Sequence, residues 1–145
     1  METTWIIVAA SGHCRCFEAE SRIGPLTEVA DLVMPASRLR EQELVSDRPG
    51  RTFDSFGSGR HAMEPRTPPK EIEGRRFAAE IVDMLEAARQ QGRFDRLGIV
   101  AAPGFLGLLR NALSDGLRKL VAFEIDKDLT RQRPEEIRAL LPERL

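Results

Sequence analysis

The order of apolar segments along the chain constrains the fold more than any other feature of the sequence. Three short segments, 4–10, 14–20 and 26–34, follow one another closely and are separated by Ser11-Gly12-His13 and by Gly24-Pro25. Short connections rich in turn residues are typical of antiparallel strands. The first 34 residues therefore predict a three-stranded meander.

The rest of the chain is dominated by alternating helical and strand patterns. After Pro68-Pro69, apolar residues recur at helical spacing up to Gly92, which predicts a long amphipathic helix. The other expected elements are a short helix at 37–46, strands at 97–102 and 120–126, and helices at 105–113 and 134–141. Strands joined through helices require crossover connections and pair in parallel. The fold class expected is α/β, with a mixed five-stranded sheet flanked by helices.

Length and composition predict one domain over residues 1–145. A chain of 145 residues with 41% hydrophobic residues has enough apolar material for a single core. The N-terminal apolar run is too short for a signal peptide or a membrane span and has no positive segment before it. Cys14 and Cys16 share one face of a strand and cannot staple distant segments. We therefore expect a reducing, cytoplasmic setting and no membrane partner.

Residues 47–69 predict a long basic loop punctuated by glycine and proline. Loops of this length without structure of their own are uncommon in compact domains, and are usually functional or disordered. From Arg48 to Lys70, five cations face two carboxylates, so the local charge is +3, whereas the whole chain carries −1. The segment is either a site for an anionic partner such as RNA or a basic surface loop without a partner.

Three stretches of the chain resemble the bacterial host attachment protein family: Trp5–Ala9, the loop signature Val45–Pro65, and the strand-to-helix junction Ala102–Leu109. That family in turn resembles the middle domain of archaeal and eukaryotic peptide-chain release factors. The resemblance implies a ribonuclease-H-like α/β layer. In release factors, the corresponding Gly-rich loop carries a Gly-Gly-Gln tip that helps water attack the peptidyl-tRNA ester.

The tip of the loop departs from the release-factor pattern, because Arg60 in Gly57-Ser58-Gly59-Arg60 stands where the glutamine is expected. Arginine can clamp a phosphate through two parallel hydrogen bonds, but it has no acceptor with which to position a water. We therefore expect the loop to bind an RNA backbone more readily than it hydrolyses an ester. The candidate RNA- and phosphate-binding residues are Arg48, Arg51, Ser58, Gly59, Arg60, His61 and Arg66.

The sequence leaves open whether the protein is an enzyme. If it is one, the resemblance implies hydrolysis of peptidyl-tRNA, and the candidate catalytic residues are Arg60, His61 and Asp54. His61 and Asp54 are interpreted either as an acid–base pair or as solvated groups beside arginines.

No metal site and no cofactor are expected. His13, Cys14 and Cys16 are suitable soft ligands, but a closed zinc site needs about four, so strand packing is the favoured interpretation. The alternating carboxylates at 124–128 are interpreted as a solvated strand edge rather than a divalent-metal cluster. The chain contains neither a GxGxxG nor a P-loop spacing.

The function predicted is that of a release-factor-like domain that associates with the ribosome or structured RNA through its basic Gly-rich loop, in translation rescue. The alternative is a non-enzymatic interaction protein that affects the attachment of a bacterium to host cells.

Overall fold

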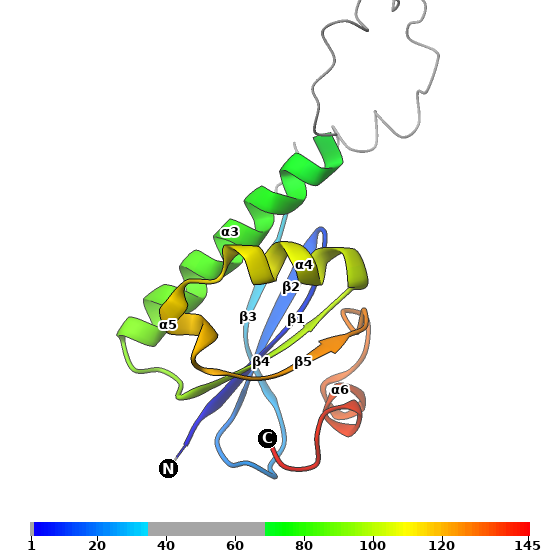
Figure 1. The fold of residues 1–145 in the computed structure, drawn as a ribbon. Helices are drawn as coiled ribbons and strands as arrows, with labels where there is room; N and C mark the ends of the chain where they lie inside the picture. Colours follow the sequence, from blue (N-terminus) through cyan, green and yellow to red (C-terminus); the bar gives the residue numbers. More distant parts are fainter. Residues whose placement is uncertain (1, 35–68) are drawn as a thin grey trace, which may run out of the picture.

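The computed structural model describes residues 2–34 and 69–145 (Figure 1). Its elements, in chain order, are the strands β1 (Thr4–Ala10), β2 (His13–Ala19) and β3 (Thr27–Val33), helix α3 (Pro69–Gln90), strand β4 (Arg96–Ala101), helices α4 (Pro103–Ala112) and α5 (Asp115–Arg118), strand β5 (Val121–Asp126) and helix α6 (Pro134–Leu140).

The five strands form one mixed sheet in the order β3-β2-β1-β4-β5. β1, β2 and β3 pair antiparallel, because the connections between them are short. β4 pairs parallel with both β1 and β5, because a helix or helices intervene along the chain. The expected mixed five-stranded α/β sheet is therefore confirmed.

Helices cover both faces of the sheet, so β1 in the centre is buried on both sides. Trp5, Ile7 and Ala9 point into a core shared with α3, α4 and α5. Ile6 and Val8 point into the opposite core, which α6 closes. Figure 1 shows α3, α4 and α5 together, with α6 beside the other side of the sheet.

The long helix begins and ends where the sequence predicts. α3 starts at Pro69, whose fixed φ and missing N–H are tolerated in the first turn of a helix. Gly92 follows the helix with φ +71°, a conformation that glycine adopts without a Cβ penalty. Pro69, the last residue of the loop expected over 47–69, is the first residue of α3, while residues 47–68 lie outside the described residues, as does the helix expected at 37–46.

Helix α5 was not predicted from the sequence. Ser114 forms its N-cap, because its side chain accepts a hydrogen bond from the backbone N–H of Leu117 at 3.2 Å. None of the described helices has both the length and the apolar content that crossing a bilayer requires.

Candidate functional site

The carboxyl ends of β1 and β4 form one edge of the sheet, the position where open α/β sheets bind ligands. The backbone N–H of Ala102 donates to Ala9 O at 3.1 Å, which ties the end of β4 to the end of β1. α4 begins directly afterwards at Pro103, and the N–H groups of Phe105 and Leu106 both donate to Ala102 O at 2.9 Å. The start of α4 is therefore fixed at this edge.

The first turns of α3 pack against α4 above the same edge. A Cβ built on Gly74 would lie 2.9 Å from Leu108 Cδ1, so glycine allows the two helices to approach closely. An edge hollow of about 310 Å³ remains, with Ser11, Glu71 and Gly104 among its lining residues. Its lining is mainly apolar and offers few groups for a charged ligand.

The segment 35–68 joins the described structure at this edge. On one side, the N–H of Met34 donates to Gly12 O at 3.0 Å, and the Met34 side chain is buried in the core shared with α3. On the other side, α3 begins at Pro69, two residues before Glu71, which lines the edge hollow. The carboxyl edge therefore holds both ends of the segment that carries the predicted loop.

The predicted loop residues themselves lie outside the described residues. These are Arg48, Arg51, Asp54, Ser58, Gly59, Arg60, His61 and Arg66. Their roles in RNA binding or catalysis stay predictions.

The described start of α3 adds little net charge to the edge. Arg75 pairs with Glu71 at 2.9 Å, and Arg76 pairs with Glu73 at 3.1 Å. Pairs at this spacing on a helix surface neutralise each other locally. The paired turns of α3 therefore carry no charge excess of their own, and the excess of +3 is a property of the sequence from Arg48 to Lys70.

His13, Cys14 and Cys16 are not brought together. The two cysteines are buried in the core shared with α3, whereas the His13 ring lies 2.7 Å from Asp31 Oδ1 in a half-exposed pair. Burial raises the pKa of the Cys14 thiol to about 12 and raises that of Cys16 as well, so neither supplies a thiolate near neutral pH. Within residues 2–34 and 69–145, no three potential ligands gather in a metal-binding group.

Two of the three carboxylates at 124–128, those of Glu124 and Asp128, also have separate partners. Glu124 Oε1 accepts a hydrogen bond from Arg110 Nε at 2.7 Å. Asp128 Oδ1 accepts from the Thr130 hydroxyl at 2.6 Å and from the Thr130 N–H at 3.0 Å. These two bonds, the hydroxyl bond above all, lower the pKa of Asp128. The two carboxylates therefore act as local tethers.

A connection that the sequence did not reveal runs through Arg15. Its guanidinium donates to both carboxylate oxygens of Glu28, at 3.0 and 3.1 Å, and to the carbonyl oxygens of Thr130 and Gln132, at 3.1 and 2.6 Å. It thereby pins the segment after β5 to β2 and β3. The partners lie up to 117 residues apart in the chain, so no local pattern could have predicted the contact.

The chain matches a protein family, a bacterial relative and solved structures. A family model described as "Protein required for attachment to host cells" matches residues 5–141. The uncharacterized protein RP470 of Rickettsia prowazekii (strain Madrid E) is 36% identical over 77 residues, which is 52% of this chain and 51% of that protein. The chain thus aligns with about half the length of this relative.

One of the matching solved structures is that of the archaeal translation termination factor aRF1. It superimposes with a TM-score of 0.50 at 12% identity, over 97% of this chain and 35% of that one. At this identity the likeness concerns the fold alone, and the chain spans about a third of the termination factor.

Proposed function

Because the chain belongs to the family of proteins required for attachment to host cells and shares its fold with part of a translation termination factor, we propose that it binds ribosomal or other structured RNA. The binding segment is residues 47–68, and Arg51, Arg60 and Arg66 contact phosphates. The observation that carries the proposal is the charge of +3 between Arg48 and Lys70, which leaves the remainder of the chain at −4. An anionic polymer is attracted to that segment and repelled by the rest.

The anchoring of the segment supports the same proposal. Met34 and the start of α3 both join the carboxyl edge of the sheet, so both ends of the segment are attached to packed structure, and the charges in the first turns of α3 are paired. Binding residues are often carried on loops that a rigid scaffold positions. In this proposal the protein works in the cytoplasm, where ribosomes are found.

Co-sedimentation with ribosomes across a salt series tests the proposal. Each phosphate contact contributes roughly 0.7 to 0.9 to the slope of log affinity against log salt. The Arg51/Arg60/Arg66 triple alanine variant should therefore bind more weakly, with a slope lower by about two to three. The matched control is a Lys119/Arg131/Arg144 triple alanine variant, which removes the same charge at exposed positions outside the segment. Equal losses in the two variants, or no sedimentation of the wild type, would refute the proposal.

Rescue of stalled ribosomes by hydrolysis of peptidyl-tRNA is the enzymatic form of the same proposal. Arg60 in place of the release-factor glutamine favours RNA binding over hydrolysis, because a guanidinium accepts no hydrogen bond and so cannot position a water through an acceptor. Release of peptide from stalled ribosomes is measured for the Arg60→Ala, His61→Ala and Asp54→Asn variants. Unchanged release would remove these side chains from the chemistry.

A second candidate function follows from the family description. In that proposal the protein is a non-enzymatic partner of another protein that takes part in attachment of a bacterium to host cells. Recovery of the protein from culture medium, with a cytoplasmic marker enzyme absent from the same fraction, would favour this function over RNA binding.

A further inference from the structure

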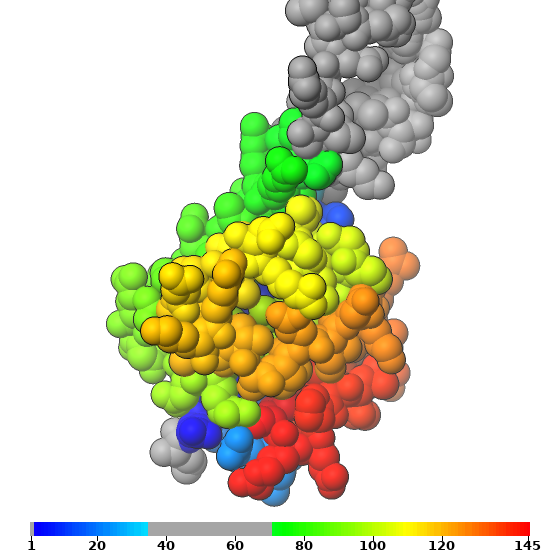
Figure 2. Space-filling view, viewed as in Figure 1, coloured from blue at the N-terminus to red at the C-terminus, as the bar shows by residue number. Residues whose placement is uncertain are grey.

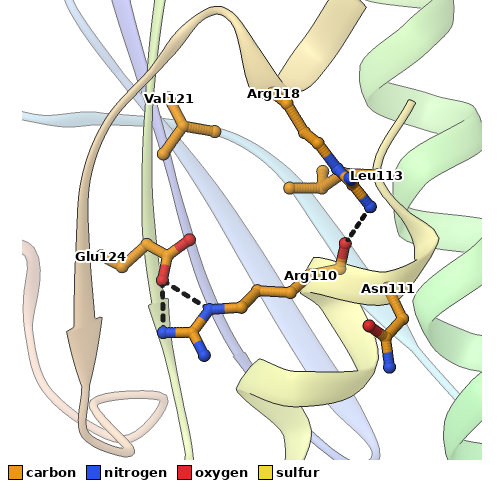
Figure 3. Close-up of a pocket in the computed structure, with 6 residues that line it drawn as sticks. All are labelled: Arg110, Asn111, Leu113, Arg118, Val121 and Glu124. Carbon is orange, nitrogen blue, oxygen red and sulfur yellow. Dashed lines mark hydrogen bonds and ion pairs between the residues drawn. The ribbon is translucent and has the colours of Figure 1, made fainter. Parts of the chain in front are cut away.

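A second hollow, which we call the α4–β5 hollow, lies between the last turn of α4, helix α5 and the edge strand β5. Its lining residues are Arg110, Asn111, Leu113, Arg118, Val121 and Glu124, and its volume is about 520 Å³ (Figure 3). Sites for small ligands commonly measure about 300–1,000 Å³. Figure 2 shows α4, α5 and β5 on one face of the molecule, with the surface hollowed between them.

The walls of this hollow are held by contacts to α3. Ser114, between α4 and α5, donates its hydroxyl to Glu86 Oε2 of α3 at 3.0 Å. A Cβ built on Gly116 would lie 2.9 Å from Arg89 Cζ, so α5 lies directly against α3. The turn from α4 into β5 is therefore fixed by tertiary contacts, and so are the backbone positions of the lining residues.

The floor of the hollow carries an ion pair with a spare acceptor. Nε and Nη2 of Arg110 both approach Glu124 Oε1, at 2.7 and 2.6 Å. The other carboxylate oxygen faces the open space between Val121 and Arg118 (Figure 3). Within the described part of the chain, no hydrogen bond occupies that second oxygen. It can therefore accept a hydrogen bond from a hydroxyl group of a ligand.

The rim carries a guanidinium with spare donors. Arg118 Nη2 donates to the carbonyl oxygen of Arg110 at 2.9 Å, which holds the side chain across the mouth of the hollow. Its other N–H groups donate to no described residue. Two guanidiniums against one carboxylate give the lining a net charge of +1. Leu113 and Val121 supply an apolar wall between the donors and the acceptor.

We propose that the α4–β5 hollow binds a ribonucleoside monophosphate unit, with the phosphate on Arg118, the ribose hydroxyls on Glu124 and the nucleoside against Leu113 and Val121. Arginine is the side chain best suited to two-point contact with phosphate. A carboxylate that accepts from ribose hydroxyls is a recurring device in nucleotide sites. The proposal goes beyond RNA binding by the segment 47–68 and does not depend on it.

One feature of the fold opposes an anion here, and the structure offsets it. The last turn of α4 exposes carbonyl groups, and the negative end of a helix dipole disfavours phosphate. Arg118 donates to one of these carbonyls and so places positive charge between the helix end and the ligand. The hollow uses neither a Gly-rich loop nor a helix N-terminus, which is why no nucleotide motif appears in the sequence.

The test titrates the ¹⁵N-labelled full chain with adenosine 5′-monophosphate, adenosine and inorganic phosphate, and follows amide chemical shifts. The nucleotide should shift the amides of the lining residues and bind about tenfold more tightly than either phosphate or adenosine. Arg118→Gln should remove most of that advantage. Lys119→Gln is the matched control, because Lys119 is the next residue, is also exposed and does not line the hollow. It should change the affinity less than about twofold.

The Glu124→Gln variant provides a second, independent test of the proposal. It weakens the acceptor for the ribose hydroxyls and releases Arg110 from its carboxylate partner. Inorganic phosphate should then bind more tightly, while the preference for the nucleotide over phosphate shrinks. Circular dichroism confirms that each variant is folded before its affinity is compared with the wild type.

Several results would overturn the proposal. They are the absence of shifts at the hollow with millimolar nucleotide, equal affinity for phosphate and nucleotide, and equal losses in the Arg118→Gln and Lys119→Gln variants. A single-stranded triadenylate distinguishes the two sources of the ligand. Tighter binding than the mononucleotide identifies a unit of an RNA strand, and weaker binding identifies a free nucleotide. The Arg51/Arg60/Arg66 triple alanine variant should retain mononucleotide binding even if ribosome association fails.

Discussion

Gly98 in β4 offers the sharpest quantitative test of the packing of the sheet. A Cβ built there would lie 2.2 Å from Phe123 Cζ and 2.7 Å from both Cε atoms, because the ring of Phe123 on β5 covers the glycine. Carbon atoms pack best at about 3.5–4.0 Å, so the ring must withdraw by roughly 1.3 Å to admit alanine. The only positive φ among the described glycines is that of Gly92, so the obstacle at Gly98 is steric and not a backbone conformation.

We expect Gly98→Ala to lower the free energy of unfolding by about 1–2 kcal/mol. Overpacking of a well-packed site costs roughly 1–3 kcal/mol, and the smaller entropy of alanine in the unfolded chain offsets up to about 1 kcal/mol of this. Gly107→Ala is the matched control, because nothing lies within 4 Å of a Cβ at that position of α4. Gly107→Ala should instead stabilise the protein by about 0.5–1 kcal/mol.

Urea unfolding followed by tryptophan fluorescence measures these changes. Trp5 is the single tryptophan, is 3% exposed and stacks on Phe94 at a centroid distance of 5.0 Å, so its emission reports the loss of the core. A double-mutant cycle isolates the ring contact. In a Phe123→Ala background, Gly98→Ala should become neutral or slightly stabilising. The same cost in both backgrounds would show that the ring of Phe123 is not the cause, and the reasoning would fail.

Two further predictions concern ionisable groups. Cys14 and Cys16 should resist a thiol reagent at pH 8 in the folded protein and react after unfolding in urea, because burial raises the pKa of both thiols, that of Cys14 to about 12. Fast labelling of the native protein would contradict their burial. The hydrogen bond from Arg15 lowers the folded-state pKa of Glu28 below 4.5, so its contribution to stability is present above that pH and is lost as the pH falls through the folded value. Glu28→Gln should therefore reduce the urea midpoint at pH 7 more than at pH 3, and equal reductions would show that the ion pair contributes nothing.

The sequence predicted most of the fold because hydrophobic periodicity and turn residues determine its main elements locally. β1 reads as a continuous apolar run since it is buried on both faces, and Gly92 ends the long helix through a conformation that glycine favours. β3 was predicted with Val29 and Val33 among its apolar residues, yet these side chains are 37% and 60% exposed. β3 is the last strand of the described sheet and pairs with a described strand, β2, on one side only. The place of a strand in the sheet depends on tertiary pairing, so a local sequence pattern could not predict that these valines are exposed.

The chemistry of the described residues was less predictable, because it depends on contacts between distant segments. Helix α5 has four residues, which are too few to show a helical period of apolar residues in the sequence, although Ser114 is a recognisable N-cap. Arg110 and Glu124 meet only because the chain reverses through α5 into β5. The candidate RNA-binding residues, by contrast, were identified from charge and glycine spacing within one segment, a signal that requires no tertiary contact.

Stability and the proposed RNA binding depend on different parts of the chain, and this makes the loop variants interpretable. The described core clusters draw on the five strands and on α3 to α6, and both attachment points of the segment 35–68 are held by groups outside it. Mutations more than about 7–10 Å apart that share no partner usually have additive effects. If Arg51, Arg60 and Arg66 contact RNA and no part of this frame, their replacement should leave the urea midpoint unchanged while ribosome association falls. A variant that lost both together would instead indicate that the segment belongs to the packed structure, and the weaker binding would then no longer argue for contacts to phosphate.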